Sequence, residues 1–271
     1  MKKRERTGER WEPLAHNETA IEHLHRYALA CEFSNGKSVL DIACGEGYGS
    51  RLLSHNAASV TGVDIDPATI EIAKEKYGDN KICFLTADAK DTQLPRQSFD
   101  LVVSFETLEH LDEHELLMKE FKRVLKPGGL LIISTPDKTE YSEKTGHRNP
   151  FHKKELSKEQ FESLLQKHFR HYHLFYQKSF QASLIRNQEQ YRYDIYSGDH
   201  LQVKKNSIVA GVYMIAIASD LELPGTNNSI FDGQSIFQAA LDEQESRFTK
   251  AFAYRFGHAL LKPAKWLKKL F

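Results

Sequence analysis

Short apolar runs alternate with mixed polar and apolar segments over the first half of this chain. Each apolar run is about five residues long, which is typical of a strand buried on both faces. Strands that alternate with helices predict a parallel sheet covered by helices. Strands are expected at 38–42, 59–63, 82–86, 99–104 and 129–134, and helices at 47–55, 67–77 and 112–124.

The flanking regions add further elements to this pattern. Apolar positions at helical spacing predict a helix over 19–33. A second helix is expected over 156–168, where Ser157 and Gln160 stand in capping-box positions. Two late apolar runs, 169–178 and 208–219, are predicted strands separated by an insertion, 179–207, and residues 230–254 are a predicted helix.

Length, charge and cysteine content describe an ordinary α/β protein of 271 residues. Basic and acidic residues both number 37, so the net charge of +0 gives no reason to expect a nucleic-acid partner. The three cysteines have no metal-ligand spacing and fit a reducing cytoplasm. The charged start is not a signal peptide, and the longest apolar run, 208–219, is too short to span a bilayer.

The stretch Val39–Gly49 is predicted to be a strand that runs directly into a glycine loop, and a helix follows. Gly45, Gly47 and Gly49 allow a tight turn and a close approach of the backbone to a ligand. Asp41 at the end of the strand would repel a pyrophosphate but would suit a ligand that carries an ammonium or sulfonium group. The spacing G-x-G-x-G also differs from the G-x-G-x-x-G of dinucleotide-binding folds.

This segment resembles motif I of the class I S-adenosylmethionine (SAM) dependent methyltransferases. The resemblance covers about residues 35–220. It implies a Rossmann-like sheet of seven strands, mostly parallel, with an antiparallel last strand, and S-adenosyl-L-methionine as the cofactor. Three domains are expected. Residues 1–34 would form an N-terminal loop and helix over the cofactor site, residues 35–220 the methyltransferase domain, and residues 221–271 a helical C-terminal extension.

The resemblance also implies where the cofactor binds. The glycine loop would hold the methionine end, Asp64 the ribose and Asp88 the adenine, while Asp66 is the better candidate to cap the helix at Pro67. Many relatives have glycine in place of Ala43, a change that we expect the site to tolerate. The expected cofactor-binding residues are Asp41, Ala43, Gly45, Gly47, Asp64, Ile65, Asp88, Ala89, Phe105 and Glu106.

A hydroxyl acceptor would benefit from a general base, and histidine is the usual choice near neutral pH. His110 follows the fourth strand and His152 lies in the irregular segment after the fifth, so both are predicted catalytic residues. Other candidates are Glu109, Asp137 and His147. No ligand cluster has convincing metal spacing along the chain, so we expect no metal.

The acceptor is suggested by three further runs, Thr7–Trp11, Glu22–Tyr27 and Asn149–Leu156. They resemble segments of bacterial methyltransferases of surface-glycan biosynthesis, which implies a hydroxyl of a sugar or a lipid-linked glycan as the acceptor. Alternatives are a small-molecule or quinone methyltransferase and a non-catalytic SAM-binding partner protein. An NAD-dependent oxidoreductase is disfavoured by Asp41 and by the missing third-position glycine.

The end of the chain, 255–271, combines five basic residues with large apolar ones and has no acids. It is either an amphipathic segment in peripheral contact with an anionic membrane or an ordinary packed helix with solvated lysines. The expected location is cytoplasmic, with the inner face of the membrane as the second alternative. Nothing in the sequence indicates an oligomeric state, and no nucleic-acid methyltransferase motif follows the fourth strand.

Overall fold

The computed structural model describes residues 18–179, 195–198, 203–206, 211–251 and 256. Most of the chain, Glu22–Asn228, belongs to one compact unit, and the first turn of α1 (Glu18–Glu32) belongs with α6 (Gln234–Lys250) to a second. The predicted tail, 255–271, lies outside the described residues except for Phe256. None of the described helices is long and apolar enough to cross a bilayer.

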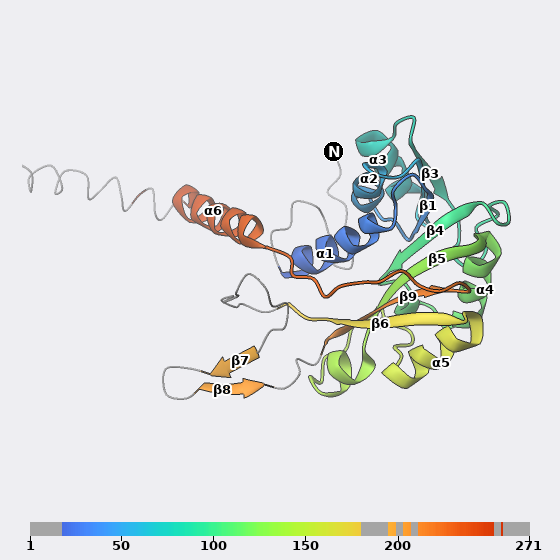
Figure 1. Cartoon of the computed structure of the whole chain (residues 1–271). Helices are drawn as coiled ribbons and strands as arrows, with labels where there is room; N and C mark the ends of the chain where they lie inside the picture. The colour runs from blue at the N-terminus through green and yellow to red at the C-terminus, as the bar shows by residue number, and fades with distance from the viewer. Residues whose placement is uncertain (1–17, 180–194, 199–202, 207–210, 252–255, 257–271) are drawn as a thin grey trace, which may run out of the picture. The chain divides into compact units, whose positions relative to one another are not determined.

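A seven-stranded sheet forms the centre of the first unit (Figure 1). Its order is β3-β2-β1-β4-β5-β9-β6. All neighbours pair in parallel except β9, which is antiparallel to both β5 and β6. The strands are β1 (Ser38–Ile42), β2 (Ser59–Asp64), β3 (Ile82–Thr86), β4 (Phe99–Phe105), β5 (Leu125–Pro136), β6 (His171–Gln177) and β9 (Tyr213–Ser219). The predicted fold class is therefore confirmed.

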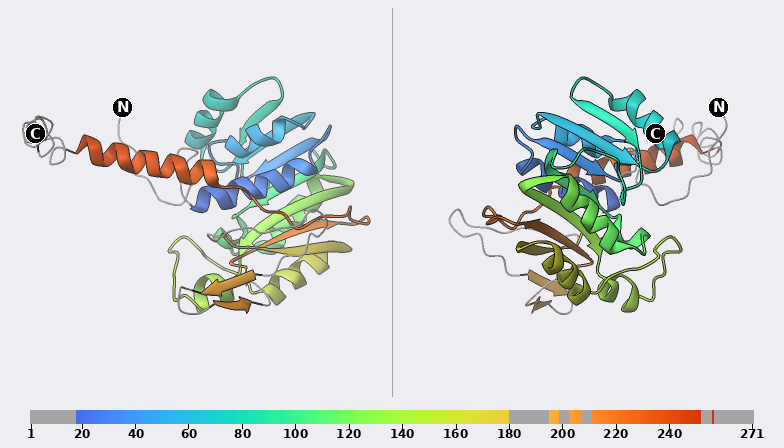
Figure 2. Two further views of the ribbon diagram at one scale, coloured as in Figure 1. Left: turned by 60° about the vertical axis from the view of Figure 1, so that its left-hand side comes forward. Right: turned by 90° about the vertical axis from the view of Figure 1, so that its right-hand side faces the viewer.

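Helices cover both faces of this sheet (Figure 2). Successive residues of β1 point to opposite faces: Leu40 packs with the helices α4 and α5, whereas Val39 packs with α1, α2 and α3. The bounds are α2 (Tyr48–Ser54), α3 (Pro67–Tyr77), α4 (His114–Val124) and α5 (Lys158–His168). A short 3-10 helix, η1 (Leu108–His110), follows β4, and a π-helical turn, η2 (Thr139–Glu143), follows β5.

Local signals in the sequence account for several element boundaries. Asp66 caps α3 by accepting a hydrogen bond from the backbone of Ala68 at 3.0 Å, as predicted. The capping box of Ser157 and Gln160 is also present. The last strand begins at Tyr213 and not at 208, and the insertion contains a separate pair of short strands, β7 (Ile195–Gly198) and β8 (Val203–Asn206).

Candidate active site

The glycine loop between β1 and α2 leaves one position open and packs two others tightly. Gly45 and Gly47 have positive φ angles of 55° and 85°. A Cβ at Gly47 would lie 2.6 Å from the ring of Phe84, and one at Gly49 would lie 1.9 Å from the ring of Tyr27. A Cβ at Gly45 would meet nothing within 4 Å. Space beside the loop is therefore available at Gly45.

Asp41 lies beneath this loop, fully buried. Its two carboxylate oxygens accept hydrogen bonds from the hydroxyls of Tyr27 at 3.1 Å and Ser50 at 2.6 Å. Burial raises the pKa of Asp41 to about 7, although these two hydrogen bonds oppose the shift. Asp41 therefore anchors α1 and α2 to the end of β1, a role that sequence reasoning did not assign to Tyr27 or Ser50.

Asp64 at the end of β2 connects the same loop to the next strand. Its carboxylate accepts hydrogen bonds from the backbone of Gly45 and of Asp66, both at 3.0 Å. Each carboxylate oxygen has two lone pairs, so an oxygen that accepts one hydrogen bond can accept a second. The side chain of Ile65 next to it is 67% exposed, an apolar surface beside a polar anchor.

Two other predicted cofactor residues follow β3, on the far side of β2. The carboxylate of Asp88 accepts a hydrogen bond from the backbone of Lys90 at 2.9 Å. Asp88 and Ala89 are both partly exposed. Since β2 and β3 are parallel neighbours, these residues lie at the same edge of the sheet as Asp64.

Phe105 ends β4 at this edge, and Glu106 follows it. Phe105 is buried and its ring meets that of Tyr27 edge-on at 5.0 Å. Glu106 has a positive φ of 49°, and its carboxylate accepts a hydrogen bond from the hydroxyl of Ser134 at 2.6 Å. A non-glycine residue in this conformation is strained, which is common at functional sites.

Arg26 on α1 is a buried cation that sequence reasoning missed. Its Nε donates a hydrogen bond to Gln177 at 2.7 Å, and its guanidinium lies 4.3 Å from the ring centre of Tyr213. Its Nη1 is 3.4 Å from the Glu106 carboxylate, yet neither Nη1 nor Nη2 has a hydrogen-bond partner among the described residues. Nη1 thus forms an ion pair with Glu106 without a hydrogen bond, and buried donors that lack a hydrogen bond are costly.

The two predicted bases, His110 and His152, come together although they lie far apart in sequence. Their ring centres are 5.1 Å apart. Nδ1 of His110 lies 3.1 Å from the backbone oxygen of Phe151, and Nδ1 of His152 lies 2.5 Å from the carboxylate of Glu155. Nε2 of His152 is 2.9 Å from the side-chain amide of Asn149.

Glu109 lies beside this histidine pair and is almost completely buried. One of its oxygens accepts a hydrogen bond from Thr135 at 3.1 Å. Burial, together with the nearby charge of Glu106, raises the pKa of Glu109 well above its usual range. Asp137, another candidate, accepts a hydrogen bond from the backbone of Thr139 at 2.9 Å at the start of η2.

Aromatic side chains connect the histidine pair with Arg26. The ring of Tyr141 stacks on that of His152 at 5.5 Å and lies 6.0 Å from that of Tyr213, on which Arg26 packs. The last histidine candidate, His147, lies 5.3 Å from Tyr141 at the outer end of the group. Polar and aromatic groups thus continue along the carboxyl edge of the sheet beyond the cofactor residues.

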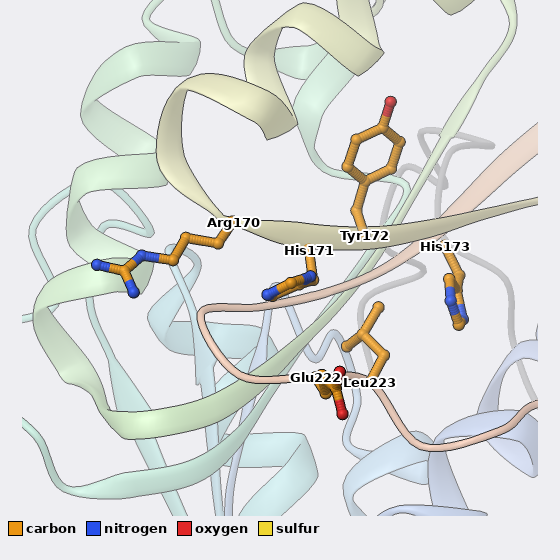
Figure 3. A pocket seen from close by; sticks show the side chains of 6 residues that line it. All are labelled: Arg170, His171, Tyr172, His173, Glu222 and Leu223. Carbon is orange, nitrogen blue, oxygen red and sulfur yellow. The ribbon is translucent and has the colours of Figure 1, made fainter.

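A cavity of about 440 Å³ lies elsewhere, at the opposite end of β6 (Figure 3). It is lined by residues that include His171, which begins β6 and pairs with Ser219. The other end of β6, Gln177, pairs with Tyr213 and contacts Arg26. In open α/β sheets, ligands bind outside the carboxyl ends of the parallel strands, so this cavity is not the predicted site.

Comparisons with known proteins agree with this geometry. Residues 40–133 match the methyltransferase domain family. A protein named "Probable S-adenosylmethionine-dependent methyltransferase/" from Mycolicibacterium smegmatis is 36% identical over 132 residues, 48% of this chain and 51% of that protein. The ubiquinone biosynthesis O-methyltransferase of Pseudomonas entomophila is 36% identical over 104 residues, 37% of this chain and 44% of that protein.

Solved structures support the fold over a longer part of the chain. A SAM-dependent methyltransferase from Archaeoglobus fulgidus superposes with a TM-score of 0.54 at 21% identity, covering 76% of this chain and 94% of that one. The chain spans about half the length of the curated relatives it matches. Over residues 40–133 the chain is similar to SAM-dependent methyltransferases, and S-adenosyl-L-methionine is the cofactor that this similarity implies.

The residues at the carboxyl edge fit this cofactor. The Nη groups of Arg26 have no hydrogen-bond partner among the described residues and suit the carboxylate of its methionine part, and the open side of Gly45 admits a close ligand. Asp64 can accept from ribose hydroxyls, and the exposed Ile65 offers an apolar surface to the adenine ring. The structure brings the predicted cofactor residues to one edge, except that Asp41 lies beneath the loop and is bonded to Tyr27 and Ser50.

Proposed function

We propose that this protein is a SAM-dependent O-methyltransferase that acts on a hydroxyl of a sugar or a lipid-linked glycan. The observation that carries this proposal is the pairing of His110 with His152, 5.1 Å apart, on the segments that follow β4 and β5. These segments adjoin Phe105 and Glu106, where the transferable methyl group is expected. The histidine pair is thus the place where an acceptor hydroxyl would lose its proton.

The pair has the features that such a proton transfer needs. SAM supplies an electrophilic methyl group when it is bound. A neutral hydroxyl is a weak nucleophile, so the protein must orient its oxygen and remove its proton. Glu155 fixes the ring of His152 through Nδ1, and the lone pair of Nε2 accepts a hydrogen bond from the Asn149 amide, which an acceptor hydroxyl would have to replace. A histidine held by a carboxylate is a common arrangement for a general base.

The polar character of the surrounding side chains favours an acceptor with many hydroxyls. Between Arg26 and His152 the edge carries Glu106, Tyr141 and Tyr213. Aromatic faces and charged hydrogen-bonding groups recognise sugar rings by apolar contact and by bonds to their hydroxyls. A lipid-linked glycan presents the same chemistry at its sugar end.

A small-molecule or quinone hydroxyl is the second candidate acceptor. It is favoured by the similarity to ubiquinone biosynthesis O-methyltransferases, which covers 37% of this chain. The same histidine pair would serve a phenolic hydroxyl, which loses its proton more readily than a sugar hydroxyl does. The two candidates therefore differ in substrate and share the proposed chemistry.

The deciding experiment is transfer of a labelled methyl group from SAM into a host-cell extract separated into glycan, glycolipid, RNA, protein and small-molecule fractions. We expect label in the glycan or glycolipid fraction. It should be lost in Asp64→Ala and kept in Asp242→Ala, a matched change on the exposed face of α6. Label among small molecules would favour the second candidate. Measured SAM binding with no label in any fraction would favour the non-catalytic alternative.

A peripheral membrane contact of the C-terminal segment would place the enzyme near lipid-linked acceptors. The five basic residues of 255–271 carry this part of the proposal. Deletion of 257–271 should reduce sedimentation with anionic vesicles and leave SAM binding unchanged. Equal sedimentation of the two proteins would favour an ordinary packed helix.

A further inference from the structure

One end of the His152 ring is occupied by a side chain from the loop between η2 and α5. Nδ2 of Asn149 lies 2.9 Å from Nε2 of His152. The other polar atom of this amide, Oδ1, accepts a hydrogen bond from the backbone of Phe151 at 3.1 Å. Since a backbone N–H can only donate, Oδ1 is the atom that faces Phe151, and Nδ2 is the donor that faces His152. The lone pair of Nε2 is therefore engaged by an amide N–H.

The opposite end of the ring has a partner that is fixed in turn. Nδ1 of His152 donates to Oε1 of Glu155 at 2.5 Å, and Oε2 of Glu155 accepts from the hydroxyl of Ser142, also at 2.5 Å. The side chains of His152 and Glu155 are only 8% and 10% exposed. This arrangement places the proton on Nδ1 and the lone pair on Nε2. A partner can be exchanged at Nε2 more easily than at Nδ1.

Two aromatic rings keep the imidazole of His152 from turning. The ring of Tyr141 stacks on it at 5.5 Å with an angle of 28° between the planes, and the ring of His110 meets it edge-on at 5.1 Å. Tyr141 and Ser142 are consecutive residues of η2, a π-helical turn, and such turns are frequent at functional sites. Nε2 therefore points in one direction, towards Asn149.

Asn149 follows an exposed part of the chain, whereas the backbone after His152 is anchored. Residues 143–148 are all exposed. The backbone oxygen of Glu109 accepts a hydrogen bond from the amide of Lys153 at 2.8 Å, directly after His152. A rotation of the Asn149 side chain, or a shift of the exposed residues before it, can therefore withdraw the amide while the imidazole stays in place.

We propose that Asn149 is a specificity-determining residue, which occupies the position of the acceptor at Nε2 and yields only to a hydrogen-bond donor. This inference rests on the proposed function, in which His152 takes a proton from the acceptor. Only another donor can replace the amide N–H without leaving the lone pair of Nε2 without a partner, and such a loss is costly in a nearly buried group. A hydroxyl is a donor, whereas an ionised carboxylate is not.

The exchange gives the reaction a definite order. The O–H group of the acceptor first replaces the N–H group of Asn149 at Nε2, and the amide turns away. The proton of the hydroxyl then passes to Nε2 as its oxygen bonds to the methyl carbon, and the carbon–sulfur bond breaks with its electron pair on sulfur. The proton leaves to water, and the amide returns to Nε2. Displacing one neutral hydrogen bond weakens acceptor binding by about two- to tenfold.

¹⁵N NMR of the full chain labelled at histidine tests the contact without an acceptor. His152→Gln assigns the resonances of His152. At about pH 8, where histidine is ordinarily neutral, we expect a proton on Nδ1 and none on Nε2. Asn149→Ala should shift the Nε2 resonance and leave Nδ1 in place. Asn80→Ala, a matched change at an exposed residue ahead of β3, should shift neither. A proton on Nε2, or an Nε2 resonance unchanged by Asn149→Ala, would overturn the proposal.

Two substitutions with opposite effects test the role in acceptor binding, measured as methyl transfer to an extract fraction that the wild type labels. Asn149→Ala should lower the amount of fraction that gives half the maximal rate by about two- to tenfold, because the acceptor no longer displaces an amide. Asn149→Asp should lower the maximal rate at least about tenfold, since a carboxylate beside Nε2 would hold a proton there. A merely structural residue would impair transfer in both variants.

A further comparison separates this inference from the proposed function. SAM affinity shows whether each variant is folded, and Asn149→Ser replaces Asn149→Ala if that variant is not. Methyl transfer by the wild type with the same half-saturation in Asn149→Ala would overturn the inference and leave the proposed function standing. Absence of label in every fraction, despite SAM binding by the wild type, would contradict the proposed function and, with it, the role of Asn149 in acceptor binding.

Discussion

The phenol of Tyr27 donates a hydrogen bond to the carboxylate of Asp41 over 3.1 Å and thereby connects α1 to the end of β1. The ring of the same tyrosine lies where a Cβ at Gly49 would collide with it. Packing and hydrogen bonding at one side chain thus hold the helix that carries Arg26 against the glycine loop. The position of Arg26 depends on an anchor beneath the cofactor site.

The raised pKa of Asp41 predicts a pH-dependent stability. Its pKa is about 7 in the folded protein and about 3.8 when unfolded, so between these values the unfolded chain releases a proton that the folded chain retains. The free energy of unfolding should therefore fall as pH rises from about 4 to 7 and stay level above. About three pKa units correspond to roughly 4 kcal/mol.

Urea unfolding of the wild type and of Asp41→Asn over this pH range measures the effect. Other ionisable groups contribute equally to both proteins, so the difference between them isolates Asp41. The advantage of the wild type over the variant should shrink as pH rises towards 7. A constant difference would show that Asp41 ionises in the folded protein as it does in water.

Ala43 predicts a stabilising substitution. Its φ of 57° lies in the left-handed region, which costs a non-glycine residue about 1–2 kcal/mol. Glycine removes this strain but loses more backbone entropy on folding, about 0.5–1 kcal/mol. Ala43→Gly should therefore raise the free energy of unfolding by up to about 1 kcal/mol and keep SAM binding.

Two control variants show whether strain at Ala43 is the cause. Ala28→Gly, at an exposed position inside α1, should lower the free energy of unfolding by about 1 kcal/mol. In an unstrained helix this change relieves nothing and only raises the backbone entropy of the unfolded chain. Ala43→Val should be destabilising, since β-branched residues tolerate the left-handed region poorly. Equal effects of Ala43→Gly and Ala28→Gly would exclude strain at Ala43.

The sheet could be predicted from sequence because its strands are short apolar runs separated by amphipathic helices. The bounds of β1, β3 and α3 were predicted to the residue. Positions within α1 were harder to predict. The apolar positions at helical spacing predict the helix, but they do not show that Ala28 is exposed and that Arg26 is buried. A buried arginine depends on partners such as Gln177 and Glu106, which no local pattern reveals.

The candidate site likewise has one part that could be predicted from the sequence and another that could not. Asp64 could be predicted because it stands at the end of a predicted strand. Its hydrogen bond to Gly45 joins two strand–helix units that are consecutive in the sequence. The meeting of Glu109, His110 and His152 could not be predicted from spacing. It depends on how the chain after β5 returns to η1, and the backbone bonds to Lys153 and Lys154 that fix this return are invisible in sequence.

Arg26 predicts a selective loss of cofactor affinity. If its Nη groups, which have no hydrogen-bond partner among the described residues, bind the methionine carboxylate, Arg26→Met should weaken SAM binding at least tenfold, about 1.4 kcal/mol. Binding of 5′-methylthioadenosine, which lacks this carboxylate, should change little. Calorimetry with both ligands makes the comparison, and an equal loss for both would indicate that Arg26 only supports the fold.

Asp64 and Asp66 stand two residues apart, with roles that substitution can separate. Asp66→Ala removes the cap of α3 and should cost about 1 kcal/mol of stability, with SAM affinity within about threefold of the wild type. Asp64→Ala should weaken S-adenosylhomocysteine binding at least tenfold. Part of this loss would come from the Gly45 amide, which loses its acceptor.

An analogue of S-adenosylhomocysteine without ribose hydroxyls separates the two contributions of Asp64. The wild type should bind this analogue more weakly than S-adenosylhomocysteine itself, because the Asp64 carboxylate loses its ligand donors. In Asp64→Ala the two ligands should bind almost equally. A loosened loop alone would weaken both by the same factor and keep the preference of the wild type, which would contradict a contact between Asp64 and the ribose.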